Sequence, residues 1–447
     1  MAAPRSPLLL AAPSSPLLLA ALTVLGCAVA GVVPPSPPER VCNVLAHGAR
    51  GDNRTEDTSA VVGAIAACAP GGTVLLPAGY IFLLRPVRLP SNLTLRIDGT
   101  IAAWPDVATW PNSTVRECST SPYETPEPQI VTAPQREALL WAVNASNIRI
   151  TGSGTIDGGG WRWWPLRNRP GNYWHNCRPS LLSFGRRWPR GWWGVRDTVV
   201  EGITLKDSPF WTIQGRGLQG VVFDNVRVYT TGCGYAQAPN TDGFNIQGQD
   251  ILIQNCRVRN GDDCVPIFPP TRNVTVRNIT CECGNGVAPI VWPSLSIPGE
   301  GGDLSDILFE DATFTGTAYA VGVKPLPSFV GQIRNVTYRR FRLSGVKQAV
   351  MINVFNQQQV AVAGSGEGRH NVASRLGTST ITGAVIEDIS GTVYSPGKLT
   401  CAAGPLKCTD FAMRNVSLAV VGGGSAAYEC ENVLGSQEDC QPRPCGW

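Results

Sequence analysis

The stretch NTDGFNIQGQDILIQNCRVRNGDDC, residues 240–264, contains the pattern that decides the fold and, at its two ends, an unusual set of acidic residues. Its middle part, DILIQNCRV (250–258), alternates apolar or β-branched residues with polar ones, passes a turn residue and continues as a second short strand. Alternation with a period of two predicts a strand with one buried face. The ends carry Asp242 and the adjacent pair Asp262 and Asp263, and like charges this close repel each other.

The same two-strand unit recurs along the chain. Its marker, the residue after the turn position, falls at Ile203, Val226, Cys256, Ile279, Ala312 and Phe341, in steps of 23, 30, 23, 33 and 29 residues. Short strands at such a period indicate a solenoid or a propeller, but a propeller needs blades of about 40 residues with a blade signature. We therefore predict an all-β fold, a parallel β-helix whose stacked coils bury one continuous core. The segment EDTSAVVGAIAAC (56–68) has helical spacing and is the predicted N-terminal capping helix.

Composition and the two ends of the chain indicate a secreted protein. The 447 residues carry a formal net charge of +4, and no basic block indicates nucleic-acid binding. An apolar run ending in AVA predicts a signal peptide over residues 1–30, with an uncleaved membrane anchor as the alternative. No other segment is long and apolar enough to span a bilayer. A Pro-rich linker (31–40), a single β-helix domain (41–420) and a Cys-containing tail (421–447) are expected to follow.

The cysteines support the same assignment. The chain has 15, and removing the one in the predicted signal peptide leaves 14, an even number that favours disulfides over metal sites. Spacing alone suggests the local bridges Cys401–Cys408 and Cys440–Cys445. Eight Asn-X-Ser/Thr sequons permit glycosylation. We expect a monomer in the extracellular space or cell wall, without cofactor or metal.

A second set of strands interleaves with the first and brings the aspartates together. Aligned on their Ile or Val, these strands begin at Asp242, Asp263, Gly286, Tyr319 and Gln348. Equivalent positions on successive coils lie about 4.8 Å apart, so Asp242 and Asp263 should stack at one sheet edge, with Asn285 or Gly286 one coil further on. Neighbours on a strand face opposite ways, so Asp262 must lie in the turn before the strand, which Gly261 facilitates.

Three carboxylates this close cannot all ionise freely, so the pKa of at least one should rise. A carboxyl group that keeps its proton beside ionised carboxylates is what hydrolysis of a glycosidic bond requires. A solvated turn, or a ladder of Asn and Asp closing a solenoid corner, is the structural alternative.

These residues resemble the signatures of the polygalacturonase family, glycoside hydrolase family 28, which are N-T-D, G/Q-D-D, G-H-G and R-I-K. They stand here as NTD (240–242), GDD (261–263), GNG (284–286) and GVK (322–324). Other stretches, such as GSGTIDGGGWRWW (152–164), look like the family as well, and the resemblance covers roughly residues 41–360.

The resemblance implies a right-handed parallel β-helix that hydrolyses α-1,4-galacturonosyl bonds of a pectic polysaccharide with inversion. By this resemblance Asp262 would protonate the leaving oxygen, and Asp242 and Asp263 would activate the attacking water. Asn240, Asn285 and Lys324 would lie at the substrate, with Lys324 on the sugar carboxylate. The resemblance also implies a disulfide between Cys264 and Cys281.

The departures from the family concern groups around this acid–base core. Asn285 replaces the family His and cannot carry a proton at neutral pH, and Gly322 replaces the family Arg, which removes a bidentate clamp for a carboxylate. Phe355 stands where the family usually has Tyr.

Two other functions stay open from the sequence. One is a pectin-binding solenoid with an inactive site. The other is a pectate lyase-like enzyme, in which Asp242, Asp262 and Asp263 would bind Ca²⁺ and Lys324 would abstract a proton.

Overall fold

The computed structural model describes residues 40–119, 132–168, 177–188, 191–291, 302–325, 331–353, 380–401 and 408–446. The predicted signal peptide, all but the last residue of the predicted linker, and Phe355 lie outside these ranges. Within them, no helix is long and apolar enough to cross a membrane.

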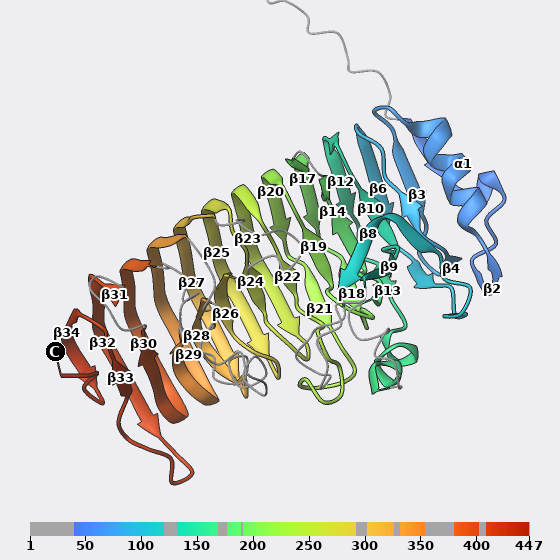
Figure 1. Cartoon of the computed structure of the whole chain (residues 1–447). Helices are drawn as coiled ribbons and strands as arrows, with labels where there is room; N and C mark the ends of the chain where they lie inside the picture. Colours follow the sequence, from blue (N-terminus) through green and yellow to red (C-terminus); the bar gives the residue numbers. More distant parts are fainter. Residues whose placement is uncertain are drawn as a thin grey trace, which may run out of the picture. The chain divides into compact units, whose positions relative to one another are not determined.

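The described chain is a parallel β-helix, in which the strands of successive coils stack into three files (Figure 1). Every neighbouring pair within a file is parallel. The first file consists of β1 (Val41–Asn43), β3 (Thr73–Leu76), β6 (Leu93–Ile97), β12 (Ile148–Thr151), β17 (Val195–Glu201), β20 (Leu218–Asp224), β23 (Gly248–Arg259), β25 (Thr271–Glu282), β27 (Leu304–Thr315), β29 (Gln332–Asn353), β30 (Thr380–Thr400), β32 (Phe411–Val420) and β34 (Gly435–Gln441). The parallel β-helix predicted from the 23–33-residue period is therefore confirmed.

The long strands of the later coils also supply the second and third files by bending at corners. Before them, the second file consists of β2 (Asp52–Glu56), β4 (Ile81–Leu84), β7 (Thr100–Ala103), β13 (Thr155–Asp157), β18 (Thr204–Lys206) and β21 (Arg227–Tyr229). The third consists of β5 (Val87–Arg88), β10 (Leu140–Ala142), β14 (Leu182–Phe184), β19 (Ile213–Gly215), β22 (Phe244–Asn245), β24 (Val265–Ile267), β26 (Val287–Val291) and β28 (Tyr319–Pro325).

Smaller elements decorate the coils. They are the antiparallel hairpins β8–β9 (Asn112–Ser119, Thr132–Arg136) and β15–β16 (Arg186–Trp188, Gly191–Trp193), and the 3-10 helices η1 (Val44–His47), η2 (Gly160–Arg162) and η3 (Trp164–Asn168). The short strands β11 (Ala145–Ser146) and β31 (Cys408–Thr409) pair within the first file, and β33 (Glu429–Glu431) continues the third file by pairing with the end of β30. Helix α1 (Thr58–Cys68) lies within the predicted helical segment; its capping role stays a prediction.

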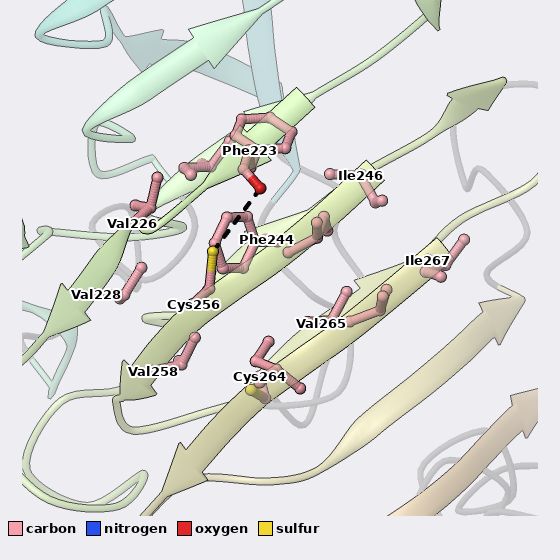
Figure 2. Close-up of a cluster of buried hydrophobic side chains, with 14 of the residues drawn as sticks. Phe223, Val226, Val228, Phe244, Ile246, Cys256, Val258, Cys264, Val265 and Ile267 are labelled. Carbon is pink, nitrogen blue, oxygen red and sulfur yellow. Dashed lines mark hydrogen bonds between the residues drawn. The ribbon is translucent and has the colours of Figure 1, made fainter. Parts of the chain in front are cut away.

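The register agrees with the repeat read from the sequence. Cys256 pairs with Ile279, Ile279 with Ala312, and Ala312 with Phe341. These side chains are buried and belong to one core that runs through the coils. Figure 2 shows the part of this core from β20 to β24, including Phe223 packed against Phe244 with ring centroids 5.4 Å apart.

The corner before each of these marker residues has a left-handed backbone. Asn255 and Asn278 adopt φ values of 56° and 50°, which Asn tolerates better than other L-residues. Their side chains stack as well, since the Asn278 amide donates to Asn255 Oδ1 at 2.7 Å and the Asn255 amide to Asp224 Oδ1 at 2.7 Å. The Asn/Asp ladder that was the alternative reading for the aspartate cluster is therefore found at this corner.

The disulfides confirm two predicted bridges and correct the third. Cys264 is bonded to Cys281 and Cys401 to Cys408. The predicted Cys440–Cys445 bridge is wrong, because Cys445 is bonded to Cys430. Cys440, on β34, pairs in register with Val416 of β32 and points into the core, where its thiol is buried. Residues beyond 420, the predicted start of the tail, also pair with the coils, since β33 pairs with β30 and β34 with β32.

Candidate active site

The third file of strands carries the three aspartates. Ile246 and Ile267 form a parallel bridge, and the amide of Gly243 donates to the Asp263 carbonyl at 2.9 Å, so Asp242 and Asp263 occupy successive coils as predicted. Asp262 lies in the bend before β24. Gly261 makes this bend possible, because a Cβ there would lie 1.9 Å from the carbonyl oxygen of Ala238.

The side chains of Asp242, Asp262 and Asp263 converge, with a carboxylate oxygen of each within 4.8 Å of the others. Asp242 and Asp263 are buried, at 5% and 2% exposure, whereas Asp262 is partly exposed. The sequence separation of 20 residues is thus one coil, and the site opens to solvent at Asp262.

Asp262 is held by three donors. Its Oδ1 accepts hydrogen bonds from the amide of Asp263 at 2.8 Å and from Asn285 Nδ2 at 3.0 Å, and its Oδ2 accepts one from Asn240 Nδ2 at 3.5 Å. Burial, followed by the negative charge of Asp263, raises the pKa of Asp262 to about 7. Asp262 can therefore keep a proton in mildly acidic solution.

Asp263 is the carboxylate with a cationic partner. Lys324 Nζ lies 2.7 Å from Oδ1 and 2.8 Å from Oδ2, and the Tyr319 hydroxyl also donates to Oδ1. Lys324, which we predicted on the substrate carboxylate, forms a partly buried ion pair with Asp263 in this structure. The pair places a positive charge directly against both oxygens of Asp263.

Asp242 has a different environment from Asp263. Its Oδ2 accepts a hydrogen bond from Asn245 Nδ2 at 3.4 Å, and its buried Oδ1 has no hydrogen-bond partner among the described residues. Burial and the charges of Asp262 and Asp263 raise the pKa of Asp242 well above its ordinary value. The two residues predicted to activate water therefore differ, and Asp263 is the one that has a cationic partner.

Asn240 is oriented by a buried arginine that the sequence reading missed. Arg178 has 0% exposure; its Nη2 donates to Asn240 Oδ1 at 2.9 Å, and its Nη1 donates to the carbonyls of Pro209 at 2.7 Å and Pro239 at 3.0 Å. With its oxygen taken by Arg178, Asn240 turns its amide nitrogen toward Asp262. No spacing in the sequence relates Arg178 to the aspartates, because the contact joins residues 62 apart.

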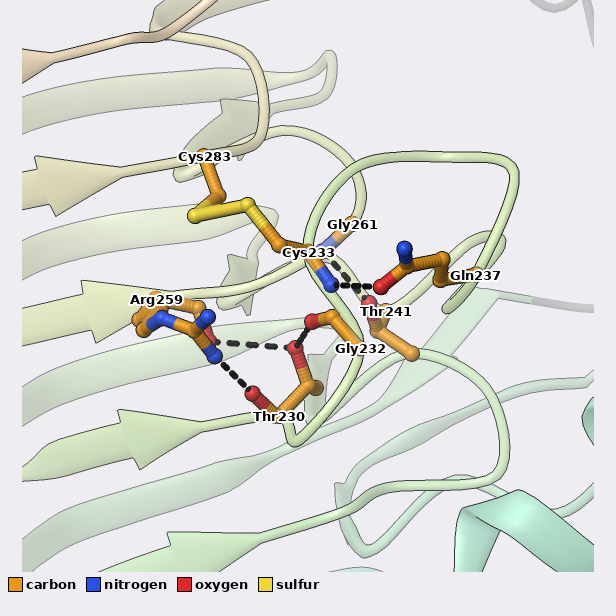
Figure 3. Close-up of a disulfide and its surroundings, with 8 residues drawn as sticks. All are labelled: Thr230, Gly232, Cys233, Gln237, Thr241, Arg259, Gly261 and Cys283. Atoms are coloured by element: carbon orange, nitrogen blue, oxygen red, sulfur yellow. Dashed lines mark hydrogen bonds between the residues drawn. A yellow bond between two sulfur atoms is a disulfide. The ribbon is translucent and has the colours of Figure 1, made fainter.

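The loop that leads to Asn240 is fixed by a disulfide and by hydrogen bonds (Figure 3). Cys233 is bonded to Cys283, at the end of β25. Thr241 Oγ1 donates to the Ala238 carbonyl at 2.7 Å and accepts from the amide of Gly261 at 2.9 Å. The NTD loop and the GDD bend are therefore joined directly.

The three aspartates are also the group that could hold a metal ion among the described residues. Ca²⁺ takes six to eight oxygen ligands. The Lys324 ammonium already lies against both oxygens of Asp263 and supplies the positive charge there. The donor set therefore fits a cation poorly.

Hydrogen bonds and the ion pair link five of the six predicted site residues, and a carboxylate oxygen of the sixth, Asp242, lies within 4.8 Å of those of Asp262 and Asp263. Tyr319 was missed as a site residue, although the strand alignment placed it in the same file as Asp242 and Asp263. The signal in the sequence was a hydroxyl group at this position, because it can donate a hydrogen bond to a carboxylate of the same file.

Comparison with known proteins places the chain among carbohydrate-active enzymes. The family model of glycosyl hydrolases family 28 matches residues 117–440. An exopolygalacturonase of Cochliobolus carbonum is 25% identical over 431 residues, 91% of this chain and 87% of that protein. A probable endo-xylogalacturonan hydrolase A of Aspergillus fumigatus is 27% identical over 415 residues, 89% of each chain. The structure of a hyperthermoactive exopolygalacturonase from Thermotoga maritima has the same fold, with a TM-score of 0.65, 21% identity, and 90% and 93% of the two chains covered.

Proposed function

The chain belongs to glycosyl hydrolases family 28, and from this we propose that it hydrolyses galacturonosyl bonds in the backbone of a pectic polysaccharide. One observation carries the proposal: Asp262, whose pKa is raised to about 7 by burial and by the charge of Asp263, lies beside Asp263, whose two oxygens accept hydrogen bonds from Lys324. Acid and base are thus separated between neighbouring carboxyl groups. Two relatives are named for their action on polygalacturonan and xylogalacturonan, and these two polysaccharides share a galacturonan main chain, which supports this substrate class.

In the proposed reaction, Asp262 gives its proton to the glycosidic oxygen as the bond from that oxygen to the anomeric carbon breaks. A water molecule attacks the anomeric carbon and gives its proton to Asp263. Asn240 and Asn285 hold the Asp262 carboxyl group in place. Asn285 cannot carry a proton itself, so the proton must return to Asp262 from solvent, on its exposed side.

We propose inversion at the anomeric carbon, although the spacing by itself argues the other way. Carboxyl groups of inverting enzymes are usually about 6.5–9.5 Å apart, and those of retaining enzymes about 5 Å. Both oxygens of Asp263 accept hydrogen bonds from Lys324, and one accepts a further bond from Tyr319. These three hydrogen bonds fix the Asp263 carboxylate against Lys324, and because a carboxylate has about four acceptor positions, one is left to accept a proton from water. Proton NMR of the first product anomer distinguishes the two outcomes.

We also propose that the protein is secreted and acts outside the cell as a monomer. The disulfides at both ends of the described chain, Cys42–Cys68 and Cys430–Cys445, support an oxidising compartment.

The test is the release of reducing ends from polygalacturonan, xylogalacturonan and rhamnogalacturonan. Asp262→Asn should lower kcat by about 10²–10⁴-fold, the usual contribution of a general acid. Asp439→Asn is the matched control, because Asp439 is exposed in the last coil and should leave kcat unchanged. Activity unaffected by Asp262→Asn would refute the acid assignment.

Two alternatives give different results in the same assay. A pectin-binding solenoid would bind these polymers without releasing reducing ends. A lyase would form an unsaturated, ultraviolet-absorbing product, and a chelator would abolish it.

A further inference from the structure

Tyr319 lies on the site-facing side of the third file, outside the main core. It is 3% exposed and forms a small separate cluster with Ala288, against which Phe268, Ala318 and Met351 pack. A tyrosine needs no charged partner to pack in such a cluster. Its hydroxyl nevertheless donates to Asp263 Oδ1, the oxygen that also receives Lys324 at 2.7 Å.

Gly322 leaves room for the Tyr319 ring. A Cβ built on Gly322 would lie 2.6 Å from Cε2 of Tyr319 and 3.0 Å from the Cβ of Ala288. Any side chain at position 322 would therefore displace the ring from its present place. The position of the Tyr319 ring therefore depends on the absence of a side chain at Gly322, and we call this dependence the interlock.

The same ring also borders Lys324. Its centroid lies 5.0 Å from Nζ of Lys324, within the range of a cation–π contact. The ammonium is thus placed between the face of the ring and the two oxygens of Asp263. Tyr319 contacts both members of the ion pair, so moving the ring would disturb both.

We propose that Tyr319 is a positioning residue that holds the Asp263 carboxylate in the place where it can activate water, and that Gly322 is required to admit the tyrosine ring. The inference rests on the proposed hydrolysis. The charged and titratable groups that face Asp263 are Lys324, Tyr319, Asp242 and Asp262, and of these only Lys324 and Tyr319 stabilise its negative charge among the described residues. Burial and the negative charge of Asp263 raise the pKa of Tyr319 well above its ordinary value, so the hydroxyl stays a donor over the working pH range.

The first test is Tyr319→Phe, which removes the hydroxyl and keeps the ring. A hydrogen bond to a charged group is worth roughly 10–100-fold, so kcat should fall by about that factor with KM nearly unchanged. Tyr428→Phe is the matched control, since Tyr428 is a buried tyrosine of the last coils whose hydroxyl has no partner among the described residues.

The second test is a double-mutant cycle between positions 319 and 322. Gly322→Ala should lower both kcat and the melting temperature in the wild-type background, because its Cβ meets the ring. In the Tyr319→Ala background the same substitution should change both much less. An equal effect of Gly322→Ala in the two backgrounds, or a kcat unchanged by Tyr319→Phe, would overturn the inference.

The melting temperatures separate this inference from the proposed function. If wild-type protein releases no reducing ends from any pectic substrate, the proposed function fails. The interlock between Tyr319 and Gly322 is then still decided by the melting temperatures of the cycle.

Discussion

Asp262 obtains its properties from its neighbours, and this gives the activity a predictable pH dependence. Its pKa is raised to about 7 by burial and by the charge of Asp263, while the hydrogen bond from Asn285 opposes that rise because it favours the ionised form. An acid must be protonated to act, so activity should be high below pH 7 and fall as the pH rises through about 7. The alkaline limb of kcat against pH should lie there in the wild type.

Asn285→Ala tests the cause of this limb. Loss of the amide donor should raise the pKa of Asp262 further, so the alkaline limb should move to higher pH while kcat on the plateau falls. Asn415→Ala, an exposed ladder position far along the chain, is the control and should leave the limb in place. A limb that stays fixed, or moves to lower pH, in Asn285→Ala would show that Asp262 does not govern it.

The positions of the aspartates could be predicted from sequence because backbone periodicity sets them. The contacts of Lys324 and Arg178 could not, because they depend on where long side chains end. Lys324 reaches across 61 residues to Asp263, and the sequence shows only that a lysine follows Gly322 by two positions. The role of a flexible charged side chain depends on the folded neighbours that compete for it.

At the scale of the strands, the corner residues determined how well the register could be read. Asn and Asp adopt the left-handed conformation at the corners, so each marks the same position of its coil. Cys256 and Cys440 follow such corners, at Asn255 and Asp439, and both are buried core residues. Closeness in sequence suggests the bridge Cys440–Cys445, but the coil position of Cys440, like that of Cys256, assigns it to the core.

The disulfides should differ in what they stabilise. Cys233–Cys283 spans 50 residues and Cys401–Cys408 only 7, so in the chain-entropy account their loss costs about 4 and about 2.5 kcal/mol, respectively. The Cys233→Ser/Cys283→Ser variant should also have a lower kcat at temperatures at which it is still folded, because the loop leading to Asn240 is no longer held by the disulfide. The variant at 401 and 408 should keep kcat. Urea unfolding and reducing-end assays measure both effects; equal kcat in the two variants would rule out the positioning role.

At the scale of the whole molecule, each coil packs mainly against its two neighbours, so stability should be local along the stack. The site draws on β22, β24 and β28, in the middle coils. The site should stay intact when the ends of the stack fray, because terminal coils can open without moving the aspartates.

Two core substitutions test this separation. Phe223 packs against Phe244, two residues after Asp242, whereas Phe411 lies in β32 near the C-terminal end. Each Phe→Ala change should cost about 3–5 kcal/mol locally. Phe411→Ala should speed hydrogen exchange in β30, β32 and β34 and leave kcat intact, because those strands can open alone. Phe223→Ala should speed exchange from β17 to β24 and lower the urea concentration at which activity is lost. If both variants lose activity and protection at the same urea concentration, the coils unfold as one unit and the site does not stay intact when the ends fray.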